Sequence, residues 1–164
     1  MNWTALSTIV DFLGALAVLV TLVYLAVQTR QNGEAIRANT RQAILASDQE
    51  LLTSMRDDPE LELMRFKADL TDLEMIRLSF LYLTFARMRE SNWFQYQNGV
   101  LDPSAWESYR NSIVAMYSTP NGIKWWKRYT ARPGILSSSF VALANGLLEQ
   151  APLTTESRLL TMFE

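Results

Sequence analysis

Two stretches of the sequence gather the side chains that could bind a ligand or a charged surface. The first, from Arg87 to Tyr96, sets charged and amide side chains beside aromatic rings. One hypothesis is a polar, aromatic-walled pocket for a small ligand. Its residues would be Arg89, Glu90, Asn92, Trp93 and Tyr96. The alternative is ordinary core packing, in which Glu90 pairs with an arginine because an unpaired charge is costly to bury.

The second stretch interleaves basic residues with aromatic ones. Such a pattern can stack on nucleic acid, but the chain has a net charge of −2, which argues against nucleic acid as a partner. We predict instead a contact with anionic lipid headgroups, to which each exposed base adds about 1 kcal/mol. The predicted membrane-surface patch consists of Lys124, Trp125, Trp126, Lys127, Arg128 and Arg132. The alternative places the tryptophans in the core and the lysines in solvent.

The composition excludes several classes of enzyme. The sequence has no cysteine and no histidine, which excludes thiolate nucleophiles, Cys-ligated metals and histidine as a general base. Two pairs of acids, Asp57 with Asp58 and Glu60 with Glu62, precede or open a short helix. We predict that they cap this helix, where negative charge is favoured, and carry no glycosidase or metal chemistry. We therefore predict a non-enzymatic protein with no cofactor and no bound metal.

The element at the start of the sequence is an apolar run from Phe12 to Val27, sixteen residues without a charge. As a helix, and extended by three residues at its start, the run would be roughly 28 Å long, close to the hydrocarbon thickness of a bilayer. No lysine or arginine precedes it, which argues against a cleaved signal peptide. A buried helix is disfavoured because the run is apolar on all sides. We predict a transmembrane anchor over residues 1–29.

The charges that follow the anchor predict its orientation. Arg30, Arg37 and Arg41 all come shortly after the apolar run. An excess of positive charge marks the cytoplasmic side of a membrane span. We expect the N-terminus outside and residues 30–164 inside, as a helical cytoplasmic domain.

One stripe of the predicted long helix has a spacing that suits a partner helix. Steps of three and four residues from Asp11 keep one line of small, hydroxyl and amide side chains on a single face. We predict a self-association seam through Gly14, Thr21, Gln28, Asn32, Asn39 and Gln42. The alternative is a solvated face, with the neighbouring apolar stripe packed on later helices. A channel lined by the seam is a further alternative.

The rest of the chain shows helical patterns and no sustained strand alternation. The first helix should end at Asp58-Pro59, because a residue before proline resists helix. Predicted helices then cover residues 60–70, about 73–98, 103–117, a short segment around 125–129, and about 138–150. The predicted fold is all-α, with one transmembrane helix continuing into a long helix, followed by a cytoplasmic multi-helix bundle.

Three stretches together resemble a known group of proteins. They are LGALAVLVTLVYLAVQTRQN, FARMRESNWFQYQNGVLDPSAWESY and NGIKWWKRY, at residues 13–32, 85–109 and 121–129. They resemble a group of uncharacterised bacterial proteins that have one N-terminal span and a helical cytoplasmic domain. The resemblance implies a bacterial inner-membrane location and no particular activity. We expect a structural or accessory module that contacts the lipid bilayer and assembles with copies of itself or with a larger membrane complex. The alternatives are an oligomeric channel and a small-ligand sensor.

Overall fold

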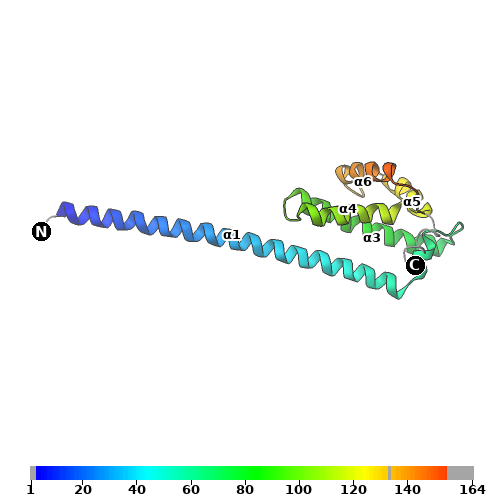
Figure 1. Cartoon of the computed structure of the whole chain (residues 1–164), viewed down its shortest axis with the longest axis horizontal. Coiled ribbons are helices and arrows are strands. Elements are labelled where there is room, and N and C mark those ends of the chain that lie inside the picture. The colour runs from blue at the N-terminus through cyan, green and yellow to red at the C-terminus, as the bar shows by residue number, and fades with distance from the viewer. Residues whose placement is uncertain (1–2, 133, 155–164) are drawn as a thin grey trace. The chain divides into compact units, whose positions relative to one another are not determined.

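The computed structural model describes residues 3–132 and 134–154. These residues form six helices and no strand, which confirms the prediction of an all-α chain (Figure 1). The helices are α1 (Trp3–Asp57), α2 (Glu60–Met64), α3 (Asp72–Gln97), α4 (Pro103–Tyr117), α5 (Pro120–Thr130) and α6 (Ser138–Gln150). Internal contacts divide the chain into two units, residues 1–42 and residues 43–164. Each unit is described by itself.

The first unit consists of the N-terminal part of α1. This helix runs without a break for 55 residues and ends at Asp57, next to Asp58-Pro59, as the sequence predicts. Every side chain from Phe12 to Val27 is exposed within the chain. Among the described residues, α1 is the one helix long and apolar enough to cross a membrane.

Local capping signals explain where the helices of the second unit begin. Thr71 and Glu74 form a reciprocal capping box at the start of α3, which satisfies two backbone donors. Asp102 accepts a hydrogen bond from the Ala105 amide 2.9 Å away, ahead of a proline in the first turn of α4. Thr119 and Ser137 cap α5 and α6 in the same way. Each such cap contributes about 1 kcal/mol.

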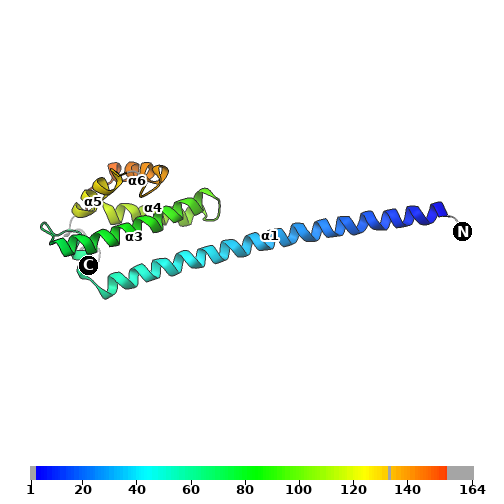
Figure 2. The ribbon, with the colours of Figure 1, turned by 180° about the vertical axis from the view of Figure 1, so that it is seen from behind.

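The core of the second unit lies around α4. This helix packs against α3, α5 and α6, and both ribbon views place it between α3 and α6 (Figure 2). Ile113 and Tyr117 of α4 are fully buried, as are Tyr82 of α3 and Phe140 of α6. One apolar cluster thus joins the three longest helices that follow α1.

Aromatic rings fill the part of the core next to α5. The ring of Trp125 stacks on Tyr129, with centroids 4.4 Å apart, and on Tyr117 at 5.8 Å. The Tyr117 hydroxyl donates to the Tyr82 carbonyl at 2.7 Å. Burial raises the pKa of Tyr117 well above its usual value and also raises the pKa of Tyr82. Both phenols therefore remain neutral at physiological pH and stabilise the core as hydrogen-bonded aromatic groups.

Gly122 in the first turn of α5 has no room for a side chain. A Cβ atom there would lie 2.8 Å from the Tyr117 Cα and carbonyl oxygen and from Thr119 Oγ1. Since two of these atoms belong to backbone, we expect Gly122→Ala to lower the free energy of unfolding by about 1–3 kcal/mol. Urea unfolding of the full chain in mild detergent, followed by tryptophan fluorescence, measures this change.

Gly146 in α6 provides the matched control. A Cβ atom added there meets nothing within 4 Å. Gly146→Ala should therefore raise stability by roughly 0.5–1 kcal/mol, because alanine loses less backbone freedom in a helix. If Gly122→Ala raised the unfolding midpoint, as Gly146→Ala should, or left it unchanged, the close packing of α5 on the end of α4 would be contradicted.

Candidate functional site

Helix α5 separates the basic from the aromatic residues that alternate in its sequence. The side chains of Lys124, Lys127 and Arg128 are exposed, and so is Arg132 just after the helix. Trp126 is only 3% exposed, and Trp125 is half-buried in the aromatic stack. Residues three and four apart share one face of a helix, which explains the division. The structure therefore places the cations of the predicted membrane-surface patch in solvent and its tryptophans in the core.

The exposed bases of this region differ from the other basic residues of the second unit. Seven arginines and lysines each lie within 4 Å of a carboxylate: Arg56, Arg65, Lys67, Arg77, Arg87, Arg89 and Arg110. Lys124, Lys127, Arg128 and Arg132 form no ion pair with any residue that the structure describes. No Asp or Glu occurs between Glu107 and Glu149, so acidic partners are far away along the chain. These four side chains constitute what we call the α5 cationic face.

A half-open hollow adjoins the α5 cationic face. It has a volume of about 560 Å³ and lies between the end of α5, the segment that follows it, and α6. Arg132 belongs to its lining, while Ile135, Leu136 and Val141 supply apolar wall. Asn145 lies at the hollow and accepts a hydrogen bond from Trp126 Nε1 at 2.8 Å. The lining of the hollow thus combines a cation with apolar side chains. No pattern in the sequence marked it.

Arg89, the first residue of the predicted polar-aromatic pocket, is held inside the bundle. Its Nη1 lies 2.9 Å from Asp48 Oδ1, and its side chain is 7% exposed. The guanidinium also lies over the rings of Phe85, at 4.6 Å, and Tyr109, at 4.8 Å. The Asn92 amide completes the surroundings, and when its oxygen and nitrogen are assigned from the hydrogen-bond network, the oxygen accepts from Nη1 at 2.9 Å. The Arg89 guanidinium is therefore paired and packed within the protein.

Glu90 and the neighbouring rings are also engaged internally. One carboxylate oxygen of Glu90 accepts from Arg87 Nη1 at 2.9 Å, and the other accepts from the backbone N–H of Ser137. Trp93 and Tyr96 pack on Trp106, with centroids 5.4 and 5.5 Å apart. None of the five predicted pocket residues lines the hollow described above. The structure places them in the core arrangement that the sequence offered as the alternative.

The acids near the start of α2 pair with arginines. Asp57 pairs with Arg56, and Asp58 and Glu60 both face Arg77. The prediction that these acids cap α2 is wrong, because the N-cap position is Pro59 and no side chain caps the helix. Ion pairs with Arg77 of α3 hold Asp58 and Glu60, whereas Glu62 pairs with Arg65. Glu60 and Glu62 do lie in the first turn of α2, where negative charge is favoured. In the described ranges, no group of three potential metal ligands comes together.

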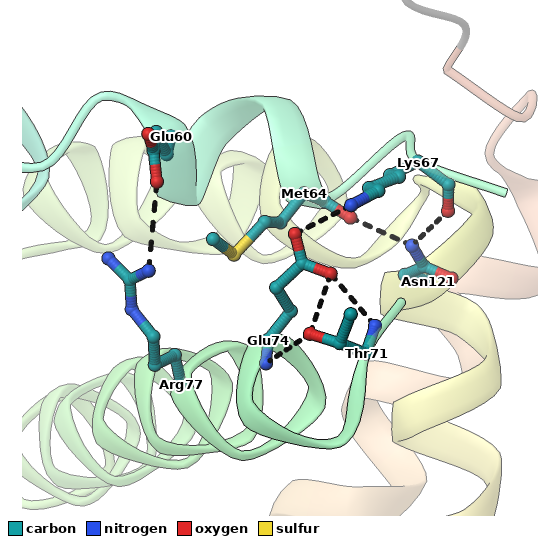
Figure 3. Close-up of polar contacts among 7 residues, drawn as sticks. All are labelled: Glu60, Met64, Lys67, Thr71, Glu74, Arg77 and Asn121. Carbon is teal, nitrogen blue, oxygen red and sulfur yellow. Dashed lines mark hydrogen bonds and ion pairs between the residues drawn. The ribbon is translucent and has the colours of Figure 1, made fainter. Parts of the chain in front are cut away.

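Polar contacts fix the connection between α2 and α3 (Figure 3), and sequence reasoning missed the long-range ones that Asn121 makes. Asn121 of α5 donates from Nδ2 to the carbonyls of Met64 and Lys67, both at 2.8 Å. Hydrogen bonds from Lys67 and from the backbone and hydroxyl of Thr71 lower the pKa of Glu74 to about 2. Figure 3 shows these side chains converging between α2, α3 and α5. Their contacts hold the α2–α3 connection against α3 and α5.

The six residues of the predicted self-association seam are all exposed on α1. A Cβ atom at Gly14 would meet nothing within 4 Å, and the Thr21 hydroxyl donates to the Ala17 carbonyl at 2.8 Å. The threonine therefore satisfies its own polar group inside the helix. The seam stays available on the surface of α1, and its pairing with another helix remains a prediction.

Comparison with protein families, with curated proteins and with solved structures gave no match. Two features of the described structure stand out chemically. They are the exposed apolar surface of α1 and the α5 cationic face with its adjoining hollow.

Proposed function

We propose that this protein is a non-enzymatic, membrane-anchored accessory module. In this proposal residues 12–27 of α1 cross a bacterial inner membrane, and the helices of the second unit form a cytoplasmic domain. The observation that carries the proposal is the exposure of the apolar part of α1. The large apolar side chains from Phe12 to Val27 are exposed on every side of the helix.

Water is an unfavourable surrounding for this surface. Burying a leucine or valine side chain is worth about 1.5–3 kcal/mol, and eleven large side chains of the segment are exposed. Soluble monomers rarely expose so extensive an apolar surface. Lipid covers such a helix on all sides at once. An α-helix also satisfies its own backbone donors and acceptors, which is the condition for crossing a bilayer.

The polar groups near the segment agree with a span that ends before Arg30. Thr21 and Thr29 donate their hydroxyls to the carbonyls of Ala17 and Leu25, both at 2.8 Å, so neither needs a partner in lipid. Arg30 pairs with Glu34 on an exposed face, which suits a headgroup or aqueous environment. The arginines that follow the segment favour a cytoplasmic second unit.

Assembly with a second copy or with a larger membrane complex belongs to the same proposal. The seam from Gly14 to Gln42 supports it, because all six of its residues lie on the exposed surface of α1. Small residues such as Gly14 allow close approach of helices in lipid, and amides such as Asn32 and Asn39 can bond across copies. The chemistry of the chain supports a non-catalytic role, since it lacks histidine and cysteine.

Single-cysteine labelling tests the span and its orientation together. The natural chain has no cysteine, so Ser7→Cys and Ser47→Cys each introduce one thiol, at exposed positions of α1 on opposite sides of the apolar segment. A membrane-impermeant maleimide should label the residue-7 variant in unlysed bacterial spheroplasts. It should label the residue-47 variant only after the spheroplasts are lysed. Labelling of both variants only after lysis would contradict the span. The reverse pattern would contradict the orientation.

A further inference from the structure

We propose that the α5 cationic face binds anionic phospholipid headgroups of the membrane in which α1 is anchored. The inference rests on the proposed function and deepens it, because it adds an electrostatic contact between the domain and the bilayer. The ligand class is a lipid with a net negative headgroup. Lys124, Lys127, Arg128 and Arg132 are the residues that contact it.

The charge distribution of the chain supports an anionic ligand. The whole sequence has a net charge of −2, yet the stretch from Ser108 to Leu148 contains five basic residues and no acidic one. One of the five, Arg110, pairs with Glu107. The other four make up the α5 cationic face and pair with no carboxylate in the described part of the chain. A cluster of unpaired charges of one sign attracts ions of the opposite sign.

The packing beneath the face favours lipid over nucleic acid. Binding of single-stranded nucleic acid combines bases with aromatic rings that are free to stack. Here the rings of Trp125 and Trp126 are packed against Tyr117, at 5.8 and 4.9 Å between centroids. The aromatic rings between the cations therefore pack in the core and are not free to stack on bases. The exposed chemistry that remains is positive charge, which lipid headgroups satisfy without stacking.

The hollow beside the face fits an amphiphile. Arg132 contributes both to the cationic face and to the lining of the hollow, whose wall includes Ile135, Leu136 and Val141. A phospholipid carries a charged group and an apolar chain next to each other. Its headgroup can pair with Arg132 while an apolar portion contacts the wall. A purely polar anion would leave this wall in water.

The size of the effect follows from general electrostatics at membrane surfaces. Each basic residue near an anionic leaflet strengthens binding roughly fivefold, so four together give an effect of several hundredfold. Salt weakens such contacts because its screening length is about 8 Å at physiological ionic strength. Anchoring also raises the local concentration of headgroups around the domain, so individually weak contacts become populated.

A fluorescent label near the face tests the proposal on the full chain. Ala131 is exposed between the cations, and Ser91 is exposed on α3, so Ala131→Cys and Ser91→Cys give a test and a control site in an otherwise cysteine-free protein. Each labelled chain is reconstituted into vesicles that contain a headgroup-nitroxide lipid as quencher. The vesicles consist of phosphatidylcholine alone or of phosphatidylcholine mixed with phosphatidylglycerol.

We expect stronger quenching of the residue-131 label in the phosphatidylglycerol vesicles, and loss of the difference at high salt. The difference should also fall severalfold when the four face residues are changed to glutamine, which leaves the buried tryptophans in place. The residue-91 label should respond equally in both vesicles. Equal quenching of the residue-131 label in both kinds of vesicle would overturn the proposal. It would also be overturned if the chain bound a single-stranded RNA and the glutamine variant lost that binding without any change in quenching.

Flotation of the same samples separates this inference from the anchor. Unlabelled full chain should float with vesicles of phosphatidylcholine alone, because α1 needs no headgroup charge. If it floats but the label shows no dependence on phosphatidylglycerol, the anchor is retained and the lipid contact of α5 is refuted. If it does not float with neutral vesicles, the proposed function fails, and the inference that rests on it fails too.

Discussion

Replacing Asp48 by alanine should lower the free energy of unfolding by about 3–5 kcal/mol, because it leaves Arg89 as a buried charge without its partner. The Arg89 side chain is almost completely buried and its Nη1 lies 2.9 Å from Asp48 Oδ1. The Arg89 Nε already has no hydrogen-bond partner. Removing Asp48 would therefore leave a second donor of the same buried guanidinium with one partner fewer. Urea unfolding of the full chain in mild detergent, followed by tryptophan fluorescence, measures the change.

Two further variants identify the origin of that effect. Asp57→Ala removes an acid from the same helix, but its partner Arg56 is exposed, so the cost should stay below about 1 kcal/mol. Replacing both members of the buried pair, with Asp48→Leu and Arg89→Met, should restore most of the stability because neither partner is left as an unpaired buried charge. Equal unfolding midpoints for the Asp48 and Asp57 alanine variants would contradict the buried ion pair.

The Asp48–Arg89 pair also has a role in the architecture. Asp48 lies on α1, the same continuous helix that carries the exposed apolar segment. Arg89 lies on α3 in the bundle core. The ion pair thus holds the part of α1 that belongs to the second unit against α3.

The bounds of most helices could be predicted because their signals are local. Asp58-Pro59 ends α1, and Asp102-Pro103 begins α4, at positions readable from neighbouring residues. The short helix α2 was overextended, since it ends at Met64 and was expected to reach residue 70. The segment after Met64 is held by Asn121, more than fifty residues away. Such a contact has no local sequence signal.

The candidate site was predictable only in part, for a similar reason. The basic and aromatic residues from Lys124 to Arg132 were found from composition, but their separation onto two faces follows from the 3.6-residue period of α5. The partners of Arg89 and Glu90 are Asp48 and Ser137, each more than forty residues away. A sequence pattern shows that a charge needs a partner but does not show which helix supplies it.

Alkaline extraction of membranes from cells that produce the full chain tests the span most directly. Leu19 and Val23 lie one turn apart in the apolar segment and are 60% and 56% exposed. An arginine near the centre of a span costs roughly 2.5–3.5 kcal/mol, so the double variant Leu19→Arg with Val23→Arg should leave the membrane. Ala38→Arg with Gln42→Arg has the same spacing on exposed positions beyond the segment.

The unmodified chain and the Ala38/Gln42 variant should stay in the alkaline membrane pellet, and the Leu19/Val23 variant should move to the supernatant. Neither double variant changes a residue of the bundle core, so a loss of folding cannot account for the difference. Release of the unmodified chain into the supernatant, or retention of the Leu19/Val23 variant in the pellet, would contradict a membrane span at residues 12–27.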